Sequence, residues 1–99
     1  MKTITPEEVL AKFDANEELH IVDVREDEEV ANGIIPGAIH IPLGQIPERL
    51  TELDQNTPYI FVCHAGGRSF SACSYLDGLG YDVTNMEGGM SSWEGELEF

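Results

Sequence analysis

The chain has 99 residues, 41% of them hydrophobic, and its 19 acidic and 5 basic residues give a formal net charge of −14. This length and hydrophobic content predict one globular domain over residues 1–99 and exclude a disordered chain. The negative charge repels phosphate backbones and anionic lipid headgroups, so it excludes nucleic acid and membrane surfaces as partners.

The amino-terminal segment predicts a helix rather than a targeting signal. Thr5 is a suitable N-cap, Pro6 fits the first helical position and Glu8 completes a capping box, so a helix is expected to about Ala15. Acidic residues occur near the start of the chain, and no apolar run approaches the roughly 18–20 residues that span a bilayer. Two cysteines without a secretory signal indicate a reducing compartment, so we expect a cytoplasmic protein with free thiols.

Short apolar runs alternate with helical patterns along the rest of the chain. Strands are predicted at residues 20–24, 38–41, 59–62 and 83–86. Helices are predicted at residues 26–32, at 43–53, from the loop at 63–68 to about Leu79, and around Met90 and Trp93. This alternation predicts an α/β fold with a mainly parallel sheet covered by helices on both faces. Ligands bind such sheets at the carboxyl ends of the strands.

The segment from Cys63 to Ser69 carries the strongest functional signal. The strand at 59–62 ends directly before Cys63, and Gly66 and Gly67 lead into the next helix. The backbone N–H groups of such a loop and the positive end of the helix dipole point at the sulfur, which stabilises a thiolate and any sulfur atom bonded to it. We therefore interpret Cys63 as a nucleophile.

Three other motifs accompany this loop: Asp23-Val24-Arg25, the turn from Gly33 to Ala38, and the segment from Gly88 to Trp93. In this order, across essentially the whole chain, the segments resemble a single-domain rhodanese, a sulfurtransferase of the thiosulfate sulfurtransferase type. The resemblance implies a rhodanese-like fold with a mainly parallel five-stranded sheet and helices on both faces. It also implies a Cys63 persulfide that receives a sulfane sulfur from thiosulfate or a persulfide and passes it to a thiol, a protein dithiol or cyanide, without a cofactor or a metal.

The same resemblance assigns roles to the residues around Cys63. The positions expected to bind the substrate, mainly through backbone N–H groups, are His64, Ala65, Gly66, Gly67, Arg68 and Ser69. Arg68 closes the loop, either by contacting the substrate or by tethering the loop to carbonyls or to a carboxylate. Asp23 and Arg25 are expected to hold the end of their strand by an ion pair or hydrogen bonds, behind the reacting groups.

The chain departs from the rhodanese pattern at two places. Ile34 stands where rhodaneses commonly have histidine, which we interpret as a change in packing. His64 and Ala65 occupy the second and third loop positions, where members active on thiosulfate often carry arginine or lysine, so the fit to thiosulfate is weakened. The donor therefore stays open between thiosulfate and a persulfide.

The remaining candidate residues receive structural interpretations. Ser69 is expected to cap the following helix, His64 to face solvent and Cys73 to be a small core residue. His20, His40, Met90 and Trp93 are likewise expected to be structural.

Other functions are compatible with parts of this pattern. Cysteine phosphatases and arsenate reductases share the architecture, but five residues separate their cysteine and arginine, whereas Cys63 and Arg68 are separated only by residues 64–67. The shorter ring of N–H groups fits one sulfur better than a tetrahedral oxyanion. A non-catalytic rhodanese-like binding module usually lacks the cysteine, and a persulfide carrier for a partner protein stays open. A zinc site is disfavoured because Cys63, His64 and Cys73 lack C-x-x-C spacing.

Overall fold

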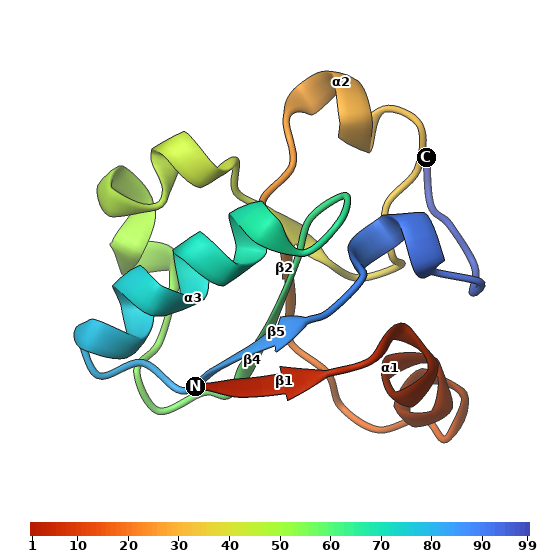
Figure 1. Cartoon of the computed structure of the whole chain (residues 1–99), viewed down its shortest axis with the longest axis horizontal. Coiled ribbons are helices and arrows are strands. Elements are labelled where there is room, and N and C mark those ends of the chain that lie inside the picture. The colour runs from red at the N-terminus through yellow and green to blue at the C-terminus, as the bar shows by residue number, and fades with distance from the viewer.

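A computed structural model describes residues 1–99 and shows a five-stranded sheet with helices on both faces (Figure 1). The strands are β1 (Lys2–Ile4), β2 (Ile21–Asp23), β3 (Ile39–His40), β4 (Tyr59–Val62) and β5 (Val83–Met86). Their order in the sheet is β1-β5-β4-β2-β3, and every neighbouring pair is parallel. The predicted α/β class and the five-stranded parallel sheet are therefore confirmed.

Three α-helices and three short 3-10 helices connect the strands. They are α1 (Pro6–Asp14), α2 (Asp27–Val30), η1 (Leu43–Gln45), η2 (Pro47–Glu52), α3 (Gly67–Gly78) and η3 (Gly89–Ser92). The predicted capping box at the start of α1 is present, with the Glu8 N–H donating to Thr5 Oγ1 at 3.1 Å and the Thr5 N–H donating to Glu8 Oε1 at 3.0 Å. None of these helices combines the length and the apolar character that a membrane-spanning helix requires.

The core consists of two apolar clusters, one on each face of the sheet. On one face, Val22 and Phe61 of the strands pack with Cys73 and Leu76 of α3. The other face buries Val9 of α1 against strand residues and partly covers Met90 and Trp93. The two clusters take alternate residues of each strand because successive side chains of a strand point to opposite faces. The predicted core position of Cys73 is confirmed by its complete burial.

Two predicted elements differ from the structure. Strand β1 was not predicted, because Lys2–Ile4 is a largely exposed edge strand without the apolar run that marks the buried strands. The predicted helix over residues 43–53 is instead the pair η1 and η2, and Arg49 has non-helical backbone angles within η2. Pro47 is the first residue of η2 and has no N–H to donate to the preceding turn, so a continuous α-helix is interrupted there.

Candidate active site

Cys63 follows β4 directly, at the carboxyl end of a strand that lies between β5 and β2. Gly66 is the N-cap of α3 and has a φ of +104°, a left-handed conformation that favours glycine. The chain therefore turns from strand to helix within residues 63–66. This turn leaves the Cys63 side chain only 1% exposed beneath the loop.

Hydrogen-bond donors surround the Cys63 sulfur. The Gly66 N–H donates to Sγ at 3.0 Å, and Ser69 Oγ lies 3.4 Å from the same atom. Burial alone raises the pKa of the Cys63 thiol, but hydrogen bonds from the Ser69 hydroxyl and from backbone N–H groups outweigh it and leave that pKa lowered. These N–H groups belong to Ser69, Gly66 and Ala65. The site can therefore hold a sulfur anion, which is the reactive form of cysteine.

Of the six predicted loop residues, three donate hydrogen bonds to the sulfur, namely Ala65, Gly66 and Ser69, and Ser69 has a different local role from the one predicted. The helix begins from Gly66, so Ser69 lies inside the first turn of α3 and the prediction that it caps the helix is wrong. Its hydroxyl, which is completely buried, reaches the Cys63 sulfur, the Gly66 carbonyl and Asn85 instead. His64 and Ala65 are exposed, so the predicted solvent-facing position of His64 is confirmed.

Arg68 ties the loop to α2. Its Nη1 and Nη2 donate to the two carboxylate oxygens of Glu29 at 2.6 Å and 2.8 Å. The Arg68 hydrogen bonds, followed by the Glu26 N–H, lower the pKa of the Glu29 carboxyl to about 2. Of the two roles predicted for Arg68, this geometry corresponds to the tether to a carboxylate.

The Arg68–Glu29 pair predicts a pH-dependent contribution to stability. Because the folded pKa of Glu29 is below its usual 4.5, the contribution is present above pH 4.5 and is lost as the pH falls toward 2. We expect Glu29→Gln to lower the free energy of unfolding near pH 7 by about 1 kcal/mol, a modest value because solvent screens this partly exposed pair. Chemical denaturation from pH 7 to pH 2 should show wild type and variant converging in acid. Glu28→Gln removes a neighbouring exposed carboxylate without an ion-pair partner, and a similar pH-dependent loss in that variant would contradict the assignment.

Asp23 and Arg25 form the predicted ion pair at the end of β2. Arg25 Nη2 donates to Asp23 Oδ2 at 2.8 Å, and both side chains are buried. Arg25 Nη2 also donates to the Gly33 carbonyl at 2.7 Å, so the pair holds the segment that follows α2 against the strand end. His40 Nε2 lies 2.7 Å from the Arg25 carbonyl, which agrees with the predicted structural role of His40. None of these contacts reaches the Cys63 sulfur.

The segment around η3 supports the loop from the other side, a role that the sequence motifs do not predict. The Met90 N–H donates to the Cys63 carbonyl at 2.8 Å, and the Ser91 N–H donates to the His64 carbonyl at 2.9 Å. A Cβ atom at Gly89 would lie 2.4 Å from the Cys63 carbonyl oxygen, so only glycine permits this approach. The only sequence signal for this support was the glycine pair within the 88–93 motif.

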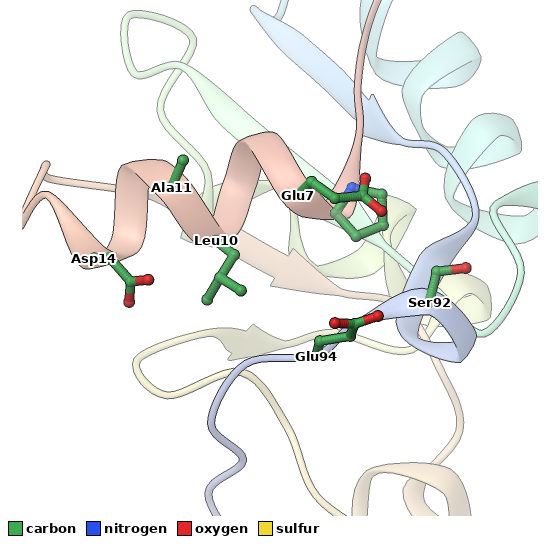
Figure 2. Close-up of a pocket in the computed structure, with 7 residues that line it drawn as sticks. Glu7, Leu10, Ala11, Asp14, Ser92 and Glu94 are labelled. Carbon is green, nitrogen blue, oxygen red and sulfur yellow. The ribbon is translucent and has the colours of Figure 1, made fainter.

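Two hollows differ in their relation to this loop. One of about 380 Å³ is lined by Arg25, Glu29, Asn32 and His64, next to the loop. Another of about 250 Å³ lies between α1 and η3, where Glu7, Asp14 and Glu94 contribute carboxylates (Figure 2). The second hollow has no cysteine, histidine or basic side chain in its lining, whereas the lining of the first includes His64 of the loop.

Charged groups near the hollow are already paired. All five basic side chains of the chain make an ion pair with a carboxylate, including Arg25 with Asp23 and Arg68 with Glu29. The second cysteine, Cys73, is fully buried, and desolvation raises the pKa of its thiol to about 12. The loop therefore combines one activated thiol with no unpaired lysine or arginine.

Comparison with known proteins agrees with this arrangement. The rhodanese-like domain family matches residues 5–96. The chain belongs to the rhodanese-like family. It is 50% identical over 98 residues to the "Putative sulfurtransferase YtwF" of Bacillus subtilis, a match that covers 99% of this chain and 95% of that protein. It is also 34% identical over 93 residues to the thiosulfate sulfurtransferase GlpE of Pseudomonas putida, covering 93% of this chain and 84% of GlpE.

A solved structure confirms the fold of this rhodanese-like chain. The crystal structure of a rhodanese-like domain protein from Staphylococcus aureus matches with a TM-score of 0.94 and 44% sequence identity, covering 100% of this chain and 98% of that one. The sulfurtransferase relatives support a role in the sulfurtransferase family. The predicted resemblance to single-domain rhodaneses is thereby confirmed.

Proposed function

We propose that this rhodanese-like protein is a sulfurtransferase that carries a sulfane sulfur as a persulfide on Cys63. The observation that supports this most directly is the buried Cys63 sulfur, which accepts a hydrogen bond from the Gly66 N–H at 3.0 Å and has a lowered thiol pKa. Cys73 offers no alternative, because burial in the core raises the pKa of its thiol to about 12. The free thiols suit a reducing compartment, so the proposal includes a cytoplasmic setting.

The reaction proceeds in two displacement steps. The Cys63 thiolate attacks the outer sulfur of a donor R–S–SH, the donor S–S bond breaks, and the thiolate R–S⁻ leaves while Cys63–S–SH forms. An acceptor thiolate then attacks the outer sulfur of Cys63–S–SH, forms its own persulfide and restores the Cys63 thiolate. The sulfur moves between thiols without net oxidation, so no other oxidant or reductant is needed. The loop donors stabilise the sulfur anion that enters the first step and is restored by the second.

The donor class in this proposal is a thiol persulfide rather than thiosulfate. Thiosulfate brings a sulfonate group, which needs a cation or several free donors. Arg68 belongs to the loop and Arg25 lines the hollow next to it, and each is paired with a carboxylate. The second and third loop positions, His64 and Ala65, add no permanent positive charge. A thiol persulfide does not need a sulfonate-binding cation, and the acceptors in the proposal are a thiol or a protein dithiol.

Intact-protein mass spectrometry tests both the reaction and the donor. The reduced protein is mixed with thiosulfate or with a thiol persulfide, and the gain of one sulfur atom on Cys63 is followed over time. We expect loading from the persulfide to be at least about tenfold faster, since a missing charged hydrogen bond is worth roughly 1.5–3 kcal/mol to thiosulfate. Equally fast loading from thiosulfate would overturn the proposed donor class. If neither donor loads sulfur onto the protein, the proposal that it is a sulfurtransferase is overturned.

A charge variant sharpens the donor comparison. Ala65→Arg places a cation at an exposed loop position and should raise thiosulfate loading relative to persulfide loading by about tenfold. Ala65→Gln adds bulk without charge and is the matched control, so a similar change of ratio in that variant would show that charge is not the cause.

A further inference from the structure

Asn85 is a buried polar residue directly behind the loop. It lies on β5, is 4% exposed, and contacts both the Gly66 carbonyl and the Ser69 hydroxyl. A buried amide is costly unless its donor and acceptor atoms are paired. Both contacts of Asn85 are with residues of the sulfur-binding loop or the first turn of α3. Its side chain is therefore fixed by the site itself.

The Gly66 carbonyl determines how the Asn85 amide is oriented. A carbonyl oxygen accepts hydrogen bonds and cannot donate them, so the group 3.2 Å from it must be Nδ2 of Asn85. This orientation turns Asn85 Oδ1 toward Ser69 Oγ, 2.5 Å away. Oδ1 is also only an acceptor. The Ser69 hydroxyl must therefore donate its proton to Asn85 in this arrangement.

The Ser69 hydroxyl has one proton and three neighbouring acceptors. They are Asn85 Oδ1, the Gly66 carbonyl at 3.2 Å and the Cys63 sulfur at 3.4 Å. While the proton is donated to Asn85, the Ser69 oxygen presents a lone pair to the sulfur and can accept a hydrogen bond from a neutral S–H group. The same hydroxyl must rotate away from Asn85 before it can donate to a sulfur anion.

We propose that Asn85 is a positioning residue that competes with the Cys63 sulfur for the Ser69 hydroxyl proton. In the thiol form, Cys63 S–H donates to Ser69 Oγ and Ser69 donates to Asn85 Oδ1. In the thiolate form, the hydroxyl turns to Cys63 and Asn85 loses its donor. Asn85 thus favours the neutral thiol and sets the fraction of thiolate at neutral pH. Its importance for sulfur transfer rests on the proposed function, whereas its effect on the thiol does not.

This competition predicts that loss of Asn85 lowers the Cys63 thiol pKa. If Asn85 only supported the hydrogen bonds to the sulfur, its loss would raise that pKa. Asn85→Leu removes the acceptor with little change in side-chain size, so the Ser69 hydroxyl is free to donate to the sulfur. We expect the Cys63 thiol pKa to fall and the thiolate fraction at acidic pH to rise about twofold to twelvefold, the range that corresponds to one net hydrogen bond. Ser69→Ala should raise the pKa. In the Ser69→Ala background, Asn85→Leu should have no further effect.

The measurement is the pH dependence of iodoacetamide alkylation at Cys63, followed by mass spectrometry of the site. A rise in pKa in Asn85→Leu, or the same fall in both backgrounds, would overturn the proposal. Asn85→Ala carries the same expectation if Asn85→Leu fails to fold by circular dichroism. The titratable and charged groups around the loop are unchanged in every variant: His64, Arg68 with Glu29, and Arg25 with Asp23.

Alkylation of Cys63 does not require sulfur transfer. The proposed function and the proposed role of Asn85 can therefore be tested independently of each other. Absence of persulfide loading in the wild-type protein would overturn the function but leave the alkylation result intact. Normal loading together with a raised pKa in Asn85→Leu would overturn only the role of Asn85.

Discussion

We expect Cys63→Ser to lose sulfur loading by at least about a thousandfold, because serine offers no thiolate and cannot form a persulfide. The hydroxyl is close in shape to the thiol and can accept the hydrogen bond that the Gly66 N–H makes to Sγ at 3.0 Å. The variant should therefore fold normally. Loading is measured by the gain of one sulfur atom in intact mass, and folding by thermal unfolding and circular dichroism.

Cys73 provides the matched control for this variant. It is fully buried in the cluster beneath α3, and its thiol pKa is raised to about 12. Cys73→Ala should therefore load sulfur at the wild-type rate, with a loss of stability of about 1 kcal/mol from the small cavity that it leaves. If sulfur loading persists in Cys63→Ser and disappears in Cys73→Ala, Cys73 carries the sulfur and the proposed function is rejected.

The predictable part of the fold is the part that local sequence patterns determine. The apolar residues of β2, β4 and β5 are largely buried in the sheet, and they reveal these strands without knowledge of their neighbours. Strand β1 escapes this reasoning because Lys2–Ile4 is exposed and becomes a strand only by pairing with β5. The segment over residues 43–53 has a helical pattern, yet Pro47 divides it into two short turns.

The candidate site also has a part that local sequence patterns predict and a part that they do not. Cys63 and its glycine-containing loop are contiguous, so the strand, turn and helix start could be recognised together. Asn85 and Gly89 could not be assigned, because their contacts join segments that are distant in the chain. Ser69 was misassigned for a related reason: the left-handed conformation of Gly66 starts the helix earlier and turns the serine inward toward the sulfur.

Gly89→Ala is expected to damage both the loop and the fold. Gly89 has a φ of +59°, and a Cβ atom there would lie 2.4 Å from the Cys63 carbonyl oxygen and 2.5 Å from that of His64. These are backbone atoms, so the loop itself must move. The movement disrupts the hydrogen bonds that the Met90 and Ser91 N–H groups donate to the same carbonyls. Conformational strain of about 1–2 kcal/mol and about 1 kcal/mol for each weakened hydrogen bond give a predicted loss of roughly 3–4 kcal/mol.

The same displacement should slow sulfur transfer by more than the loss of folded protein accounts for. Cys63 is one of the residues that must move, and its sulfur then loses the alignment with the Gly66 N–H. We expect loading to fall by about a hundredfold under conditions in which the variant is still folded, as a misplaced reacting group commonly does. Denaturant unfolding and sulfur loading on the same samples measure the two effects.

Gly80→Ala separates strain from contact. Gly80 has a φ of +91°, but a Cβ atom there meets nothing within 4 Å. It comes just after the carboxyl end of α3, whereas the loop precedes the amino end of that helix. It should cost only the conformational strain of about 1–2 kcal/mol and should load sulfur at the wild-type rate. If Gly89→Ala is no more harmful than Gly80→Ala, the backbone carbonyls of the loop are not held against η3. The position of the Cys63 sulfur must then depend on β4 and α3 alone.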